Sequence, residues 1–154
     1  MKLLRLGLAF VVTVLVLIAL QQNGAPAAEG RSPLALVRGR YSAIFSGYVI
    51  ANPLRPFAGT GLFIADGRGH VSGHETTNLN GHACDYQIKG TYTVNNDGTG
   101  TNKIDFVNGS SGCQNGNFTQ SFSIANGGDL ILLSNTNSPV VATEHWYRED
   151  KKLP

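Results

Sequence analysis

The chain has 154 residues, of which 42% are hydrophobic and only 14% are charged. Its 12 Lys and Arg residues exceed its 10 Asp and Glu residues by two, and Lys2 and Arg5 account for that whole excess. Beyond residue 27 the chain is formally neutral without a basic run, so its charge excludes an electrostatic footprint for nucleic acid or for an anionic membrane surface. The remaining length suits a single domain with one core.

Residues 1–27 predict a secretory signal peptide. Lys2 and Arg5 form a basic start, the uncharged run Leu6–Leu20 follows, and Ala25-Pro26-Ala27 fits the small residues of a cleavage site. The run is shorter than the roughly 20 apolar residues of a membrane span. We therefore expect a secreted or periplasmic protein with no stable membrane insertion after cleavage; an uncleaved anchor is the alternative.

A short N-terminal segment, 28–38, precedes the main domain, which we expect over 39–150 with a C-terminal tail at 151–154. The sequence "SPLALVRG" from Ser32 predicts a short helix in this segment. Ser32 could cap it, Pro33 suits its first turn and Gly39 could end it.

Eight stretches rich in β-branched and aromatic residues follow, separated by clusters of Gly, Asn and Asp. We predict strands at 40–50, 57–66, 69–78, 85–94, 99–107, 117–125, 129–135 and 140–148. The alternation is clearest in the fourth, where Tyr86, Ile88 and Tyr92 face one way and Gln87 and Lys89 the other. Such alternation predicts an antiparallel sheet with one buried and one wet face.

Asp66-Gly67, Asp97-Gly98 and Gly127-Gly128 have the composition of tight hairpin turns. Turns between twisted strands often need a positive φ, which glycine adopts at little cost. A calcium loop is the alternative interpretation of "NNDGTG" from Asn95, but its one carboxylate is far from the six to eight oxygen ligands typical of calcium. The turn is the favoured interpretation.

If consecutive strands pair, the connections alternate between two ends of the sheet. One end receives the short turns, and the other receives the longer segments 51–56, 79–84, 108–116 and 135–139. Cys84 and Cys113 both fall at this second end and, in an exported protein, predict a disulfide worth about 3.5 kcal/mol; two free buried thiols are the alternative. We predict an all-β, mainly up-and-down barrel of eight antiparallel strands, with a β-sandwich as the alternative.

"GTGLFIADGRGHVSG" from Gly59 and "GTYTVNNDGTGT" from Gly90 resemble the paired turn motifs of a group of small exported bacterial proteins. That group shares a G-x-x-x-x-D-G-x-G-x-x-x-G hairpin followed by G-T-Y-x-V-x-x-D-G-x-G-T. The outline is also similar to calycin-like and allene-oxide-cyclase-like barrels. The resemblance spans residues 39–148 and implies the fold, and no catalytic residue comes with it. The G-x-W of lipocalins is absent near the first strand, and Trp146 lies in the last strand instead.

Strand parity also predicts which polar side chains enter the barrel. We expect a ligand site with aromatic walls, because buried polar groups need partners from each other, from water or from a ligand. The predicted site residues are Glu75, Tyr86, Asn102, Gln120, His145 and Tyr147. The alternatives are a sealed core in which Glu75 and His145 pair, or a wrong parity.

No nucleophile motif, phosphate-binding loop or paired catalytic carboxylates can be placed, and we expect no catalytic residue, metal or cofactor. His70 and His74 would lie roughly 13 Å apart along a strand, too far to share an ion. A metal site made of His74, Glu75 and His82 would need the connection that carries His82 to fold back over the rim.

The favoured function is a non-enzymatic module that binds a small apolar or amphipathic ligand at the long-connection end. A structural or surface-assembly role is the first alternative, and a cyclase or isomerase using Glu75 or His145 is the second.

Overall fold

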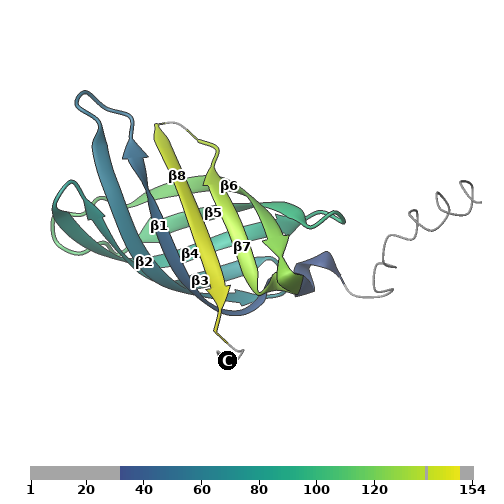
Figure 1. Ribbon diagram of the computed structural model, residues 1–154. Coiled ribbons are helices and arrows are strands. Elements are labelled where there is room, and N and C mark those ends of the chain that lie inside the picture. The colour runs from purple at the N-terminus through teal and green to yellow at the C-terminus, as the bar shows by residue number, and fades with distance from the viewer. Residues whose placement is uncertain (1–31, 138, 150–154) are drawn as a thin grey trace, which may run out of the picture. The chain divides into compact units, whose positions relative to one another are not determined.

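The computed structural model describes residues 32–137 and 139–149, which form a closed barrel of eight antiparallel strands paired in sequence order (Figure 1). The strands are β1 (Arg38–Val49), β2 (Arg55–Asp66), β3 (His70–Leu79), β4 (His82–Val94), β5 (Thr99–Val107), β6 (Gly116–Ala125), β7 (Leu130–Asn135) and β8 (Val140–Arg148). The predicted barrel is confirmed, and the sandwich alternative is wrong because β1 pairs with β8 and closes the sheet. The predicted leader 1–27 and tail 151–154 lie outside the described residues.

The Asp-Gly turns hold their hairpins through the aspartate side chains. Asp66 Oδ1 accepts hydrogen bonds from the backbone N–H groups of Arg68 and His70, at 2.7 and 3.0 Å. Asp97 Oδ1 accepts from the N–H and the hydroxyl of Thr99, at 2.9 and 2.7 Å. Both aspartates thus bond the backbone of their own turns, which supports the turn interpretation of residues 95–99.

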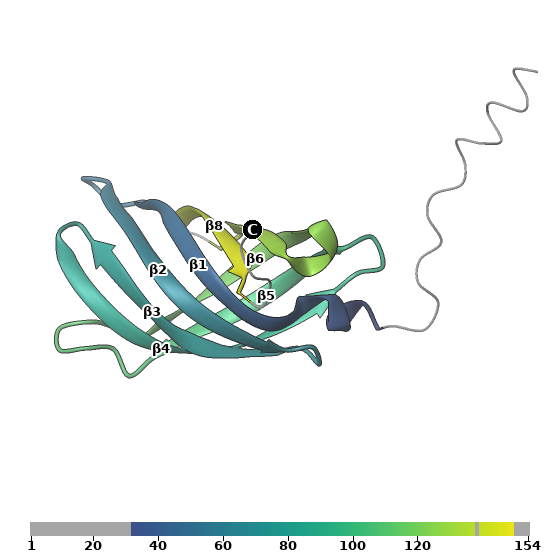
Figure 2. The same ribbon diagram turned by 60° about the horizontal axis from the view of Figure 1, so that its bottom comes forward.

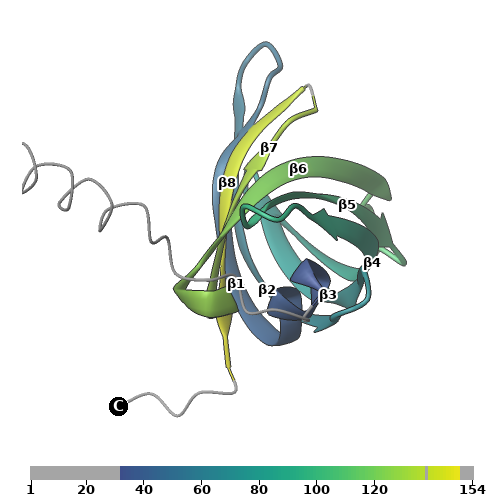
Figure 3. The same cartoon turned by 90° about the vertical axis from the view of Figure 1, so that its right-hand side faces the viewer.

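The short-turn end of the barrel is closed by η1, a 3-10 helix at Pro33–Val37 (Figure 3). Val37 is 1% exposed, its carbonyl accepts from the Tyr92 hydroxyl at 3.1 Å, and Arg148 Nη2 donates to the Leu36 carbonyl at 2.7 Å. Two details of the predicted helix are wrong. The Ser32 side chain makes no capping bond, and β1 begins before position 39.

The main hydrophobic core fills the half of the barrel next to η1. Its centre is the ring of Trp146, which stacks on Phe63 at 4.8 Å between centroids and packs at 5.9 Å from Tyr41. A smaller cluster, Phe45, Phe57 and Ala142, lies nearer the opposite end. A Cβ added at Gly59 would lie 2.4 Å from the Phe45 ring, so this aromatic ring covers a position that only glycine can occupy.

The longer connections, residues 50–54 and 108–115, gather at the end opposite η1 (Figure 2). The predicted long connection 79–84 is wrong. Asn80 and Gly81 alone join β3 to β4, with φ of 52° and 91°, and form a two-residue turn that suits the strand twist. None of the helices in the described part of the chain has the length and apolar character needed to cross a membrane.

Candidate functional site

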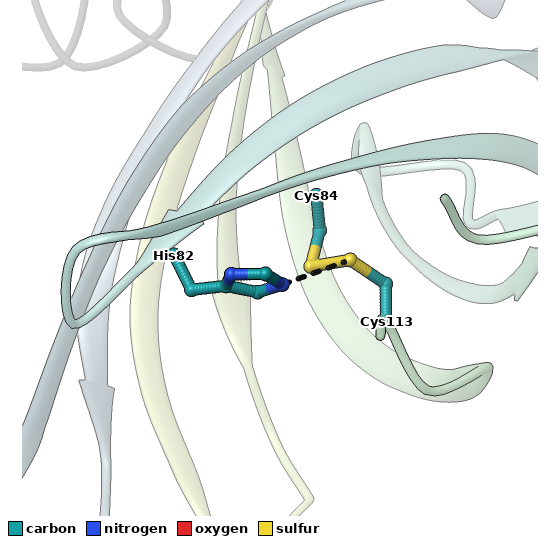
Figure 4. A group of neighbouring side chains, drawn as sticks. All are labelled: His82, Cys84 and Cys113. Carbon is teal, nitrogen blue, oxygen red and sulfur yellow. Dashed lines mark hydrogen bonds between the residues drawn. A yellow bond between two sulfur atoms is a disulfide. The ribbon is translucent and has the colours of Figure 1, made fainter. Parts of the chain in front are cut away.

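A disulfide between Cys84 of β4 and Cys113 of the 108–115 connection stands at the long-connection end, as predicted (Figure 4). The two Cα atoms are 5.7 Å apart, and the bond spans 29 positions of sequence. A backbone hydrogen bond also ties the connection to β4: the Ser110 N–H donates to the Asp85 carbonyl at 3.0 Å. The connection is therefore tied to the neighbouring strand at several points, which holds one wall of the barrel opening in place.

His82 lies beside the bridge, with its Nε2 3.7 Å from Cys113 Sγ (Figure 4). The ligand atoms of His82, Cys84 and Cys113 all fall within 4.8 Å of one another. Metal coordination requires thiolates, and both sulfurs are joined to each other here. While the bridge is intact, this group of side chains cannot bind a metal ion through its sulfur atoms.

Directly inside the rim is a cavity of about 520 Å³, here called the mouth cavity. Most of its wall is aromatic or aliphatic, and its rim is polar. The aromatic side chains contact one another: Tyr86 and Phe106 lie 5.4 Å apart, and Phe106 meets Phe118 edge-to-face at 4.8 Å. The wall side chains are Phe45, Val49, Phe57, Leu79, Tyr86, Phe106 and Phe118, and Arg55, His82 and Asn115 lie among the rim residues.

Glu75 of β3 borders the inner side of the mouth cavity. Its side chain is 6% exposed, and Oε1 accepts a 2.7 Å bond from the Thr77 hydroxyl. Burial is the main reason that the pKa of Glu75 rises to about 8, the Thr77 bond opposes the rise, and the nearby Glu144 carboxylate adds to it. At neutral pH, Glu75 is therefore mostly protonated and can donate a hydrogen bond into the cavity.

Glu144 of β8 is a second buried acid, which the sequence analysis missed. It is 8% exposed, and its oxygens accept from Trp146 Nε1 at 2.6 Å and Gln120 Nε2 at 2.8 Å. Desolvation raises the pKa of Glu144, against these two bonds. The single tryptophan was a usable signal. A large aromatic side chain at Trp146 favours the interior, and strand alternation then places Glu144 inside as well.

The predicted inward orientation of His145 and Tyr147 is wrong. Tyr147 is 49% exposed, His145 is half-buried, and the two side chains contact each other at 3.3 Å on the outer wall. Glu75 and His145 therefore neither pair in the core nor share the cavity. The cyclase or isomerase hypothesis keeps only Glu75 as an inward acid–base candidate from its original pair.

Three of the other predicted site residues lie inside the barrel as parity indicated. Tyr86 lines the mouth cavity, and Asn102 and Gln120, 3% and 2% exposed, are cross-strand partners in the interior. Within the described residues, neither polar atom of the Asn102 amide has a hydrogen-bond partner, and Gln120 Oε1 has none either. His74 is exposed on the outer wall, so the His74–Glu75–His82 set is not assembled.

No family model matches the chain, and a search of curated proteins finds no significant match. The likeness to calycin-like and allene-oxide-cyclase-like barrels therefore stays a prediction based on the turn glycines.

Proposed function

We propose that the protein is an exported, non-enzymatic module that binds a small apolar or amphipathic ligand in the mouth cavity. The observation that carries this proposal is a cavity of about 520 Å³ with aromatic walls and a protonated carboxyl at its inner side. Ligand pockets commonly measure about 300–1,000 Å³ and combine apolar walls with a few polar groups. The disulfide supports the exported location, because such bonds persist in oxidising compartments.

The distribution of packing within the barrel also supports the proposal. The half next to η1 holds the buried cluster around Tyr41, Phe63 and Trp146 and needs no ligand to fill it. The opposite half keeps a hollow beside the 108–115 connection, which the disulfide ties to β4. A binding site held open before the ligand arrives loses less conformational entropy on binding.

Thermal-shift screening against a library of apolar and amphipathic compounds tests the proposal. A compound present at a hundred times its Kd adds about 2.7 kcal/mol to the free energy of unfolding. For a domain of this size, that increase raises the Tm by about 10 °C. Thr77 lines the cavity and Thr76 faces outward on the same strand, so they offer a matched pair of variants. Thr77→Phe should abolish the shift and Thr76→Phe should retain it. A library without hits, or equal effects of the two variants, contradicts the proposal.

A structural role through the outer wall is the second candidate, and it has its own supporting observation. Ile44, Tyr48 and Val141 are 54%, 52% and 59% exposed, and Tyr48 and Val141 are direct cross-strand partners on β1 and β8. Exposed apolar side chains that adjoin one another are typical of association surfaces. Light scattering over a concentration series distinguishes the candidates: self-association that Val141→Ser abolishes favours this role, and a monomer at every concentration removes it.

A further inference from the structure

A small void lies directly beneath the mouth cavity. It has a volume of about 10 Å³, room for about one water-sized group, and is here called the floor void. Five residues, Phe45, Phe57, Glu75, Phe106 and Phe118, line both spaces, so the two adjoin. A ligand whose body fills the mouth cavity could therefore place one small terminal group in the floor void.

The polar lining of the floor void leaves one acceptor, Gln120 Oε1, and one donor, Asn135 Nδ2, without a partner among the described residues. It comes from two carboxyl groups, Glu75 and Glu144, and two amides, Gln120 and Asn135. The Gln120 Nε2 group is used by Glu144 and Asn135, which leaves its Oε1 buried without a partner among the described residues. A buried carbonyl oxygen without a donor is costly, so this atom indicates a missing donor.

The two carboxyl groups also lack a cation. Ion pairs of the described residues join Arg40 to Glu149 and Arg148 to Asp129, and none within 32–137 and 139–149 reaches Glu75 or Glu144. The pKa of both groups is raised, chiefly by burial. Buried carboxylates are ordinarily paired with a positive charge or kept neutral by a proton. At Glu75, whose pKa is raised to about 8, a proton takes the place of the absent cation.

We propose that the ligand is an amphipathic primary amine whose ammonium group enters the floor void between Glu75 and Glu144 while its apolar body fills the mouth cavity. This inference rests on the proposed function and names the ligand class of the same site. An ammonium group brings three N–H donors and a positive charge in the volume of one water molecule. Its donors match the free acceptor Gln120 Oε1 and the two carboxylates.

Binding of the amine should release a proton. Below about pH 8 Glu75 carries a proton that an ammonium group replaces, so the complex holds the carboxylate and the proton passes to solvent. Glu144 faces this group from β8 and Tyr86 adjoins it from β4, while Arg55 and His82 lie at the rim of the cavity. Neither rim residue lines the floor void.

Isothermal titration calorimetry of the full chain with four matched probes tests the proposal: 2-phenylethylamine, 2-phenylethanol, phenylacetate and trimethyl(2-phenylethyl)ammonium. We expect the primary amine to bind on the order of tenfold or more tightly than the alcohol, because its bonds are charge-assisted. Phenylacetate should bind most weakly, since it would meet two acids. The trimethylammonium probe should lose the advantage, because its head exceeds the floor void.

Buffers of different ionisation enthalpy then count the released protons, with an expected value near one for the amine and zero for the alcohol at pH 6.5. E75Q should remove both the proton release and the preference for the amine. Asp105→Asn, a carboxyl loss on the outer side of β5, should leave both unchanged.

Equal affinity of amine and alcohol overturns this inference and leaves the proposed function standing. Failure of all four probes and of the library overturns both. Retained affinity of the trimethylammonium probe also overturns the floor void as the cation site.

Discussion

Replacing Glu75 by Gln should flatten the pH dependence of stability. Burial raises the pKa of this carboxyl from 4.5 to about 8 in the folded protein. Between these values the folded state keeps a proton that the unfolded state has lost, so the free energy of unfolding falls as pH rises through the window. The stability contribution is fully present below about pH 4.5 and is lost above about pH 8.

The expected size of this loss follows from the shift. A rise from 4.5 to about 8 corresponds to about 5 kcal/mol of unfolding free energy. Glu144, whose pKa is also raised by burial, acts in the same direction. A small domain is stable by only about 5–15 kcal/mol, so the protein should be clearly weaker at pH 9 than at pH 5.

Urea unfolding at pH 5, 7 and 9, followed by the fluorescence of the single tryptophan, measures the effect. E75Q cannot ionise, so it should lose less stability over this range than the unaltered protein and be the more stable of the two at pH 9. Asp105→Asn should follow the unaltered protein. Parallel curves for E75Q and the unaltered protein would refute the burial argument, as would a protein that gains stability from pH 5 to pH 9.

Three further variants test other parts of the structure. The double variant Cys84→Ser with Cys113→Ser opens a loop of 29 positions and should lower the free energy of unfolding by about 3.5 kcal/mol, or the Tm by about 14 °C in calorimetry. An unchanged Tm would contradict a stabilising role of the disulfide. Gly128→Ala should cost about 2–3 kcal/mol in urea unfolding, because φ is 96° and the added Cβ would lie 2.1 Å from a carbonyl oxygen of η1. Gly116→Ala, with open space around its Cβ, is the control and should be nearly neutral. Equal costs of the two variants would refute the backbone strain at Gly128. Trp146→Phe removes the 2.6 Å bond to Glu144 Oε1 and should cost about 1–3 kcal/mol by calorimetry, and a neutral effect would show that the bond is dispensable.

The barrel could be predicted from local signals that agree with one another. The two Asp-Gly turns and the alternation around Ile88 place strands and faces independently, and both indicate the same antiparallel order. The shared rim of Cys84 and Cys113 followed from that order. Gln120 was placed inside because its own strand alternates between apolar and polar residues, and Glu75 was placed inside because Tyr86 of the neighbouring strand faces inward.

The face of β8 could not be read from apolar–polar alternation alone, and only the large ring of Trp146 favours one of its two faces. Val140, Val141 and Ala142 are apolar in succession, and positions 144–147 offer two equivalent alternations, each with one charged or titratable group and one aromatic ring. Pairing with β1 and β7 settles the choice, since it sets Trp146 against the core and His145 outside. That closure is a non-local property, which a local pattern does not carry.

The hollow beneath the rim was equally beyond local pattern. Whether a barrel interior is filled depends on which inward side chains meet at each level across eight strands. Tyr41, Phe63 and Trp146 meet at the level near η1 and fill it. The rings nearer the rim lie against the wall and one another, as Phe106 and Phe118 do, and leave the centre open.

A crystal structure of the protein under xenon pressure tests the central claim most directly, because xenon reports apolar space without requiring a known ligand. We predict xenon density among Phe57, Phe106 and Phe118, at the same end of the barrel as the Cys84–Cys113 bridge. A mouth filled by side chains, with no xenon inside the barrel, would contradict the account.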